Sequence, residues 1–498
     1  MLTSTKDSLQ RPLADLYRQS LALLADEYEL TMAYGYWKSG TAEKEAAFTV
    51  FFRKNPFQGG FTLACGLRHV IDYVRDFRFD ESDVAYLAEL RGADDRPIFD
   101  AGFLDYLQKM RLECDIDAVP DGTVVFPQEP LVRVVGPIIQ AQILESALLN
   151  IMNFQTLIAT KAARIKVAAG DRPVIEFGLR RAQGVDGALS ASLAAYVGGC
   201  SGTSNLLAGK LYGIPVKGTH AHSWVMSFDT EAEAFRAYAE AMPNNSVFLV
   251  DTYDTIEGVK HAIEAGRWLK DNGHRLLGIR LDSGDLAYLS IEARRLLDQA
   301  GFRQAAIIAS NDLDEHIISS LHDQGAQIGV WGVGTKLVTG YDQPALGGVY
   351  KLTAVRRPGE AWQHKIKLSE QAVKINNPGI LQVNRFMRDG LFVGDVIFDE
   401  QNPPKGPVVM VDPLDMTRRR RFDDSDHCTE LLRPIFRSGN LVYQLPSLDE
   451  TRSYAQTQLD GFHASIKRLL NPHEYPVGLE VRLHELKTKL ILKERGFA

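Results

Sequence analysis

The stretch that decides the fold is residues 174–227, VIEFGLRRAQGVDGALSASLAAYVGGCSGTSNLLAGKLYGIPVKGTHAHSWVMS. Three short apolar runs in it predict strands, at 174–177, 195–197 and 214–216. A turn with glycine and polar residues follows each run. Because α/β barrels and open α/β sheets build their sites from such turns at the carboxyl ends of successive strands, we expect function here. The plainer interpretation is that these turns are connectors and that His222 is an ordinary loop or core histidine.

The same alternation of strand, loop and helix continues to about residue 352. Further strands are predicted at 246–251, 275–281, 305–309 and 327–330, with helices at 229–241, 255–271 and 285–300. Continuous apolar strands between helices indicate parallel βαβ units that are covered on both faces. About seven strand candidates are enough to close a barrel, so an α/β fold with an irregular (β/α) barrel is favoured over an open sheet.

The rest of the chain predicts a second α/β domain. Helices are expected over 13–50, 63–111 and 137–169, and strands over 114–135, 365–369, 391–398 and 407–412. The late strands are expected to pair with those near 120–135. The expected domains are an N-terminal domain, 1–150, completed by 353–440; the barrel, 151–352; and a helical C-terminal segment, 441–498, taken mainly from 447–470 and 479–495.

Composition excludes several classes of protein. The net charge of −7 offers no general basic field for nucleic acid. Four cysteines without CxxC spacing argue against a zinc ribbon or a disulfide framework, and fit reduced thiols in the cytoplasm. The N-terminus lacks the apolar core of a signal peptide, and no apolar run of about eighteen residues is present to span a membrane.

Several loop residues predict a phosphate-rich ligand. The turn Gly332–Val333–Gly334–Thr335 follows an apolar strand, and backbone N–H groups at such turns bind phosphate oxygens. Its spacing is neither that of a Walker A loop nor the GxGxxG fingerprint. The arginines Arg180, Arg181 and Arg280 stand at strand ends and suit bidentate pairing with phosphate or carboxylate.

Asp282 and Asp285 stand on one turn, separated by Ser-Gly. Carboxylates at a strand end can bind Mg²⁺ through water and contact the hydroxyls of a sugar. The structural alternative is that either residue caps the helix that begins near 285.

His222 is a candidate general base, metal ligand or nucleophile, and its neighbour Ser223 is a candidate substrate contact. Only His220 is near enough in sequence to share a metal, so zinc is not favoured. Tyr28 lies on a predicted helix, where its plainer role is that of a core aromatic. Arg53 precedes a Pro/Gly loop that could face an anion.

The motifs together resemble the nicotinate phosphoribosyltransferase family, in the same order along residues 26–379. They are DEYELTMAYGYW (26–37), FFRKNPFQGG (51–60), NFQTLIATKAARI (153–165), EFGLRRAQGVDGA (176–188), GCSGTSNLLAG (199–209), GIPVKGTHAHS (213–223), RLDSGDL (280–286), ASNDLDE (309–315), GVGTKLVT (332–339) and KIKLSEQAVKINNPG (365–379).

The resemblance implies an enzyme that joins nicotinate to phosphoribosyl pyrophosphate, giving nicotinate mononucleotide and pyrophosphate, with ligase-type coupling to ATP hydrolysis and with Mg²⁺. It implies a barrel of the quinolinate phosphoribosyltransferase type plus an α/β domain, in a homodimer that shares its active sites. By that match, Tyr28 from the partner subunit and Phe177 sandwich the pyridine ring, while Arg180 faces the ring and its carboxylate. His222 is the histidine that ATP phosphorylates.

By the same match, Arg280 and Asp282 handle the ribose-phosphate and ring region. The loop that holds the 5′-phosphate comprises Gly332, Gly334 and Thr335. Arg53 and Lys367 match basic residues of the pyrophosphate or nucleotide site.

Ser204 bears on the choice of substrate. In relatives that use nicotinamide the matching loop ends in aspartate, which would repel a carboxylate, whereas serine can donate a hydrogen bond to it. Nicotinate is therefore expected over nicotinamide. The alternatives are a nicotinamide or quinolinate phosphoribosyltransferase, a phosphosugar aldolase or isomerase with Glu176 as its base, and a non-catalytic binding protein of the same fold.

Overall fold

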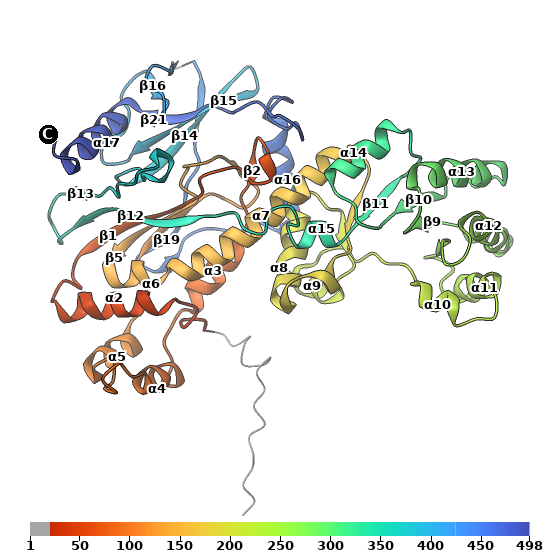
Figure 1. Cartoon of the computed structure of the whole chain (residues 1–498), viewed down its shortest axis with the longest axis horizontal. Helices are drawn as coiled ribbons and strands as arrows, with labels where there is room; N and C mark the ends of the chain where they lie inside the picture. The colour runs from red at the N-terminus through yellow and green to blue at the C-terminus, as the bar shows by residue number, and fades with distance from the viewer. Residues whose placement is uncertain (1–19, 424, 498) are drawn as a thin grey trace, which may run out of the picture.

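The computed structural model describes residues 20–423 and 425–497. Two large sheets at one end of the molecule and a third at the other are joined by the long helix α7, Glu145–Ala169 (Figure 1). Leu148 and Met152 of α7 lie in the core beside one of the first two sheets, and Ala159 and Ala162 lie in the core of the third. One helix therefore fixes the two halves of the molecule to each other.

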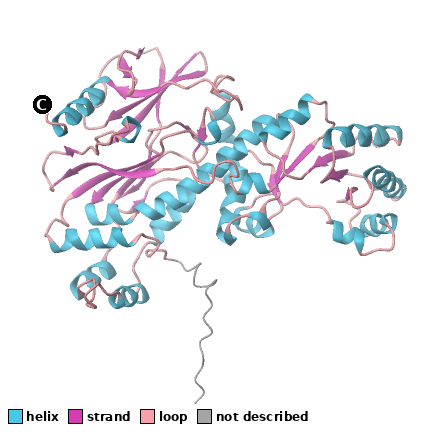
Figure 2. Cartoon of the chain, viewed as in Figure 1, coloured by secondary structure: helices cyan, strands magenta, loops and turns pink. Residues whose placement is uncertain are grey.

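The third sheet is parallel and has six strands in the order β7-β6-β11-β10-β9-β8. Its strands are β6 (Val174–Glu176), β7 (Gly202–Thr203), β8 (Val247–Leu249), β9 (Gly278–Leu281), β10 (Ala306–Ala309) and β11 (Val330–Val333). The helices between them include α8 (Gly184–Val197), α11 (Glu231–Ala241), α12 (Thr255–Asp271), α13 (Leu286–Gln299) and α14 (Glu315–Asp323), and they surround the strands (Figure 2). This is the predicted βαβ arrangement.

The parallel sheet is a half-barrel, and residues 214–220 span its open side. Val216 forms a parallel bridge with Thr203 of the edge strand β7. At the other edge, Nε2 of His220 accepts a hydrogen bond of 3.2 Å from the backbone N–H of Leu249 in β8. The predicted irregular barrel is therefore confirmed as a half-barrel, with a loop in place of a regular closing strand.

Three strand predictions in this half were wrong in detail. Residues 195–197 are the last turn of α8, not a strand, because a short apolar run does not distinguish a buried helix from a buried strand. Residues 214–216 contribute only the single bridge at Val216. Strand β11 begins at Val330, where the strand predicted over 327–330 ends.

The second sheet is antiparallel, with the order β13-β12-β1-β5-β3-β19-β20. Its strands are β1 (Glu45–Phe51), β3 (Asp115–Ala118), β5 (Val132–Pro137), β12 (Val349–Arg356), β13 (Gln363–His364), β19 (Arg433–Arg437) and β20 (Asn440–Leu441). The helices near it are α2 (Glu27–Lys38), α3 (Leu67–Asp76), α4 (Glu81–Glu89), α5 (Ala101–Lys109) and α6 (Ile138–Ile143). The helix predicted over 13–50 was partly wrong, because a turn at Gly40, with φ of 67°, separates α2 from the central strand β1. Its first part lies outside the described residues.

The remaining large sheet has the order β17-β16-β21-β15-β14-β18. Its strands are β14 (Leu381–Arg388), β15 (Leu391–Asp399), β16 (Val408–Val411), β17 (Arg419–Phe422), β18 (His427–Glu430) and β21 (Val477–Glu480). The strands predicted over 391–398 and 407–412 exist as β15 and β16, but their expected pairing with the strands near 120–135 was wrong. Residues 365–369 are not a strand.

The C-terminal segment was predicted to be helical, and it does form α16 (Leu448–Asp460) and α17 (Val481–Glu494). It also supplies β21, which lies between β15 and β16. Across the described ranges, we find no helix that is both long and apolar enough to cross a bilayer.

Candidate functional site

The turn after β11 lies directly against Phe177, the residue that follows β6. The backbone N–H of Phe177 donates to the Val333 carbonyl at 2.8 Å. A Cβ atom added at Gly332 would stand 2.6 Å from two ring carbons of Phe177, and one at Gly334 would stand 3.2 Å from the Phe177 carbonyl oxygen. Because glycine has no side chain, the predicted phosphate turn can lie in direct contact with Phe177.

Thr335 is the first residue of α15, Thr335–Val338, for which Gly334 is the N-cap. The first N–H groups of a helix have no acceptor within the helix, so they are available to an anion. Gly334 and Thr335 are both half-buried. The expected place of the 5′-phosphate loop is thus beside the ring of Phe177.

The neighbouring strand ends continue the site from this turn. A Cβ atom on Gly332 would lie 3.4 Å from Cβ of Ser310, the residue after β10. The Ser310 hydroxyl donates a short hydrogen bond to Oδ1 of Asp282, the residue after β9. Contacts therefore run without a break from Phe177 through Gly332 and Ser310 to Asp282.

Arg280 points from β9 to the loop that spans the half-barrel. Its Nη1 donates to Oγ1 of Thr219 at 2.7 Å, and its Nη2 stands 3.7 Å from Oδ1 of Asp282. Burial lowers the pKa of Arg280, while Asp282 and Asp251 oppose that shift and the positive charge of Arg180 adds to it. Arg180 itself is exposed, in the turn after Phe177. The positive charges of Arg180 and Arg280 therefore act on each other across the site.

His222 lies between two carboxylates. Its Nε2 is 3.9 Å from Oδ1 of Asp251 and 3.9 Å from Oδ2 of Asp282, while its Nδ1 is 3.1 Å from Oγ1 of Thr252. The imidazole is 39% exposed, so an incoming ligand can reach it. The Thr252 hydroxyl oxygen can accept a hydrogen bond from Nδ1–H, and in that tautomer the Nε2 lone pair is free for chemistry.

Asp251 is the most important residue that the sequence argument left without a role. Its side chain is 1% exposed, and Oδ2 accepts from the Asp282 backbone N–H at 2.7 Å and from the Ser283 hydroxyl at 2.8 Å. Oδ1 is buried without a hydrogen-bond partner in the described part of the chain. The available signal was its position at the end of an apolar run, two residues after β8, much as Asp282 and Ser310 follow β9 and β10.

His220 has a structural role that distinguishes it from His222. It packs among Phe235, Tyr238 and Phe248, and its Nε2 accepts from Leu249. Burial lowers the pKa of His220 to about 4. The residue is therefore neutral near pH 7 and holds the spanning loop in place.

Glu176 is also structural. It is buried, and its carboxylate accepts from the backbone N–H of Gly178 and from the hydroxyls of Ser192 and Thr203. A carboxylate with three donors is poorly placed to remove a proton from a substrate, which argues against an aldolase or isomerase base here. The carbonyl of Glu176 accepts from the backbone N–H of Ser204, so Ser204 begins the next loop of the same site.

Two further candidates sit at the edge of this region. Ser223 is exposed on α10, His222–Met226. Asp285 caps α13 through a hydrogen bond of 3.0 Å from the Tyr288 backbone N–H, which is the structural role considered for it above. Among the residues that the structure describes, no group of three or more His, Cys, Asp or Glu side chains is arranged to hold a metal.

Tyr28 is not brought to this site within one chain. Tyr28 lies on α2, at the opposite end of the molecule from β9 (Figure 1). It is 45% exposed and lines a cavity of about 580 Å³ with Asn150 and Asn153 of α7. Burial, followed by the charge of Glu145, raises the pKa of Tyr28 to about 12.

Arg53 and Lys367 belong to a separate basic cluster with Lys351 of β12. Burial lowers the pKa of Lys351, and the positive charges of Lys367 and Arg53 lower it further. Nε of Arg53 is buried without a hydrogen-bond partner among the described residues. The carboxylate of Glu145 also acts on Lys351 and opposes this shift of its pKa. The three cations of the cluster together still suit an anionic ligand.

Known protein families match this chain along most of its length. Family models for the nicotinate phosphoribosyltransferase N-terminal domain, the nicotinate phosphoribosyltransferase family and the nicotinate phosphoribosyltransferase C-terminal domain match residues 23–153, 173–374 and 381–487. The chain is 44% identical over 486 residues to nicotinate phosphoribosyltransferase of Bacillus subtilis, covering 95% of this chain and 97% of the relative. It is 37% identical over 534 residues to that of Caenorhabditis elegans, covering 95% and 93%.

Two solved structures share its fold. Human nicotinic acid phosphoribosyltransferase superimposes with a TM-score of 0.82 at 33% identity, covering 93% of this chain and 99% of the human chain. Nicotinate-nucleotide pyrophosphorylase from Pyrococcus furiosus superimposes with a TM-score of 0.67 at 21% identity, covering 89% and 95%, which is a likeness of fold alone.

Proposed function

Because the chain belongs to the nicotinate phosphoribosyltransferase family, we propose that its strand-end site transfers the phosphoribosyl group of phosphoribosyl pyrophosphate to nicotinate. One observation carries the assignment of the site. The contacts from Phe177 through Gly332 and Ser310 to Asp282 and His222 form one continuous surface at the carboxyl ends of four parallel strands. A planar ring, a sugar phosphate and a reactive histidine can therefore be held side by side.

Nicotinate binds with its ring against Phe177. The half-buried ring of Phe177 rests on Gly332, which leaves its other face to a ligand. Arg180 pairs with the carboxylate of nicotinate, and Ser204 donates to the same group, so the site prefers an acid over an amide. Tyr28 of the partner subunit completes the sandwich.

The phosphoribosyl group lies between the Gly334–Thr335 turn and the strand ends. The turn binds the 5′-phosphate through its free N–H groups. As pyrophosphate leaves, C1 of the ribose gains positive character, and Asp282 stabilises it electrostatically. Arg280 is held by its hydrogen bond to Thr219, and its positive charge stabilises anionic oxygens of the substrates beside the pyridine ring.

His222 attacks the γ-phosphorus of ATP through Nε2 while Thr252 holds Nδ1, the bond to the β–γ bridging oxygen breaks, and ADP leaves. Water later cleaves the N–P bond and releases phosphate, which restores the free imidazole. Two carboxylates 3.9 Å from Nε2 would repel an anionic phosphate. The unpartnered Oδ1 of Asp251 and Oδ2 of Asp282 suit Mg²⁺, which takes one or two carboxylates and completes its shell with phosphate oxygens and water. When bound there, Mg²⁺ would neutralise phosphate charge. Asp285, which the sequence also suggested as a ligand of Mg²⁺, caps α13 and is the weaker candidate.

The active unit is a homodimer with shared sites. Its support is that Tyr28 lies at the opposite end of the chain from the strand-end site, while the site still requires a second aromatic face. Arg53 and Lys367 supply cations for the pyrophosphate or nucleotide. The four cysteines are free thiols, which supports a reducing compartment such as the cytoplasm.

The test is product analysis with nicotinate, phosphoribosyl pyrophosphate and Mg²⁺, with and without ATP. Wild type should form nicotinate mononucleotide and pyrophosphate, and ATP should stimulate the reaction. His222→Ala should lose ATP hydrolysis but keep weak transfer without ATP. The matched control is His274→Ala, because His274 is also half-buried and its Nδ1 lies 3.1 Å from Oδ1 of Asn244, away from the site. Unchanged ATP hydrolysis in His222→Ala would remove the residue from its proposed role.

A further inference from the structure

The turn at Phe57 and Gln58 has an unusual backbone. Both residues lie in the short 3₁₀ helix η1, Pro56–Gln58, with φ of 58° and 49°. Residues other than glycine rarely adopt this left-handed region, and two in succession persist only where the surroundings hold them. The turn stands four residues after Arg53, within the FFRKNPFQGG motif.

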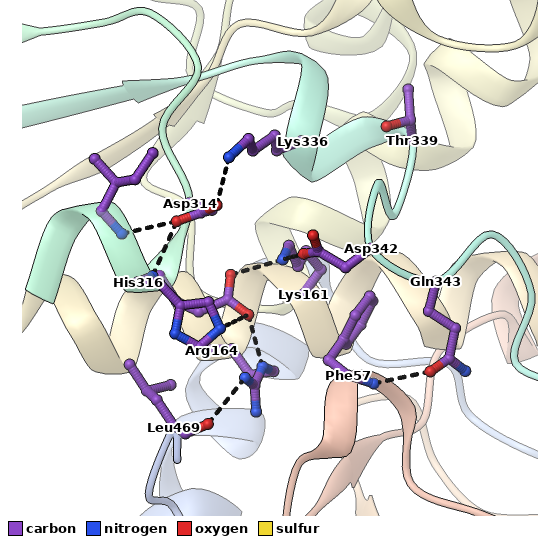
Figure 3. Close-up of polar contacts among 12 residues, drawn as sticks. Phe57, Lys161, Arg164, Asp314, His316, Lys336, Thr339, Asp342, Gln343 and Leu469 are labelled. Atoms are coloured by element: carbon purple, nitrogen blue, oxygen red, sulfur yellow. Dashed lines mark hydrogen bonds and ion pairs between the residues drawn. The ribbon is translucent and has the colours of Figure 1, made fainter.

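Two contacts from other parts of the chain hold the turn (Figure 3). Oε1 of Gln343 accepts a hydrogen bond of 3.0 Å from the Phe57 backbone N–H. Nζ of Lys161 lies 4.9 Å from the centroid of the Phe57 ring, a distance typical of a cation–π contact. The backbone and the side chain of Phe57 are thus fixed from separate elements.

The contact from Lys161 rests on a largely buried ionic network. Lys161 of α7 is fully buried, with Nζ 2.7 Å from Oε2 of Glu315 and 2.5 Å from Oδ2 of Asp342. Arg164, one turn further on α7, pairs with Oε1 of Glu315 at 2.8 Å. Because both cations share the buried carboxylate of Glu315, the ammonium under the Phe57 ring has little freedom to move.

Gln343 is held by a contact within its own segment. Its Nε2 donates to the Ala345 carbonyl at 2.9 Å, and its neighbour Asp342 is the partner of Lys161. The segment that carries Gln343 is continuous with α15, which starts at Thr335 in the proposed phosphate turn. One segment therefore supports the proposed phosphate turn and holds the turn that follows Arg53.

Arg53 needs such support because it stands among like charges. Its neighbours in the basic cluster are Lys351 and Lys367, and cations close together repel one another. Nε of Arg53 has no hydrogen-bond partner among the described residues, so the backbone on either side contributes to holding the guanidinium in the cluster. On the N-terminal side the Phe52 carbonyl accepts from the Gln128 backbone N–H at 2.8 Å. On the C-terminal side the support is the Phe57 turn.

We propose that Gln343 and Lys161 are positioning residues that hold the Phe57–Gln58 turn and thereby place Arg53 for the pyrophosphate group of phosphoribosyl pyrophosphate. This inference rests on the proposed function, in which Arg53 binds that group. Neither positioning residue contacts the substrate. Loss of the support leaves the chemistry intact and allows Arg53 to move away from its anion.

The test compares Gln343→Leu, which cannot accept from Phe57, with Gln343→Glu, which keeps an acceptor oxygen of the same reach. Gln343→Leu should raise KM for phosphoribosyl pyrophosphate about five- to tenfold, from the loss of one hydrogen bond of ordinary strength, with kcat and KM for nicotinate changed less than twofold. Gln343→Glu should restore KM to within twofold of wild type. Gln324→Leu is the matched control, because Gln324 contacts only Ser320 on the exposed end of α14.

Two further variants separate the possible failures. Arg53→Ala should raise KM for phosphoribosyl pyrophosphate at least as much as Gln343→Leu; an unchanged KM in Arg53→Ala would defeat the proposed role of Arg53. If Arg53→Ala raises KM and Gln343→Leu does not, only the positioning inference is overturned. In a Phe57→Gly background, where glycine adopts the left-handed backbone freely, Gln343→Leu should lose most of its effect; an undiminished effect would also overturn the inference.

Discussion

Gly332→Ala tests the close approach between the phosphate turn and Phe177. The added methyl group would stand 2.6 Å from two ring carbons of Phe177, where carbon atoms normally approach to about 3.5–4.0 Å. The ring must therefore move by about 1 Å. Because Phe177 is only half-buried, it can move without loss of the fold.

The displaced ring would occupy space that the account gives to nicotinate. A misplacement of about 1 Å in a binding group can cost about a hundredfold in rate, which is about 2.7 kcal/mol of transition-state stabilisation. We expect kcat/KM for nicotinate to fall by about that factor, while the affinity for phosphoribosyl pyrophosphate, measured by calorimetry, changes less.

The assay is steady-state formation of nicotinate mononucleotide at saturating phosphoribosyl pyrophosphate, with nicotinate varied. Gly187→Ala is the matched control, since a Cβ atom there meets nothing within 4 Å. A Gly332→Ala enzyme with kcat/KM within twofold of wild type would refute the placement of nicotinate against Phe177.

Three other predictions follow from the same geometry. Ser204→Asp should lower kcat/KM for nicotinate at least tenfold and raise it for nicotinamide, measured with both bases, because a carboxylate repels an acid and accepts from an amide; retained preference for nicotinate would contradict the role of Ser204. Asp251→Asn should lower ATP hydrolysis at least tenfold, measured as ADP release at several Mg²⁺ concentrations, since a neutral amide binds Mg²⁺ less well; Ser283→Ala, which removes one of the two donors to Oδ2 and keeps the carboxylate, is its control. His220, whose pKa falls from 6.5 to about 4 on folding, binds fewer protons when folded, so the free energy of unfolding should decrease as pH falls from 6.5 to 4, by up to about 3 kcal/mol; a His220→Asn variant that shows the same acid-side slope in denaturant titrations would contradict this.

The parallel half of the fold could be predicted from its sequence because its strands are buried on both faces. Residues 174–175 and 247–250 are continuous apolar runs followed by polar residues, a pattern typical of strands in parallel sheets. The helix predicted over 255–271 has the bounds of α12. Functional side chains gather at the carboxyl ends of parallel strands, and this rule also predicted that Asp282 and His222 would belong to one site.

The segment at 195–197 shows the limit of that reasoning. Its residues are buried, as a strand would be, yet they end α8, whose alanines pack against α7. Alanine favours a helix, but a run of three apolar residues carries no period. The strand that follows, Gly202–Thr203, has no apolar pattern, and its pairing with β6 follows from tertiary structure alone.

Sheet partners at long range were also beyond the sequence. Strand β1 pairs with β5 and with β12, some three hundred residues further along the chain, and β21 enters the sheet beside β15. Alternation predicts that a strand has one buried face, not which strand lies beside it. The two contacts that hold Phe57 could not be predicted for the same reason, since Lys161 and Gln343 are far from it in sequence.

The most direct test of the account is a crystal structure of the enzyme with nicotinate mononucleotide bound. We predict that the pyridine ring stacks on Phe177 with its carboxylate at Arg180, and that the 5′-phosphate meets the backbone of Gly334 and Thr335. A nucleotide bound away from these residues, with the surface between Phe177 and Asp282 left to solvent, would contradict the central claim.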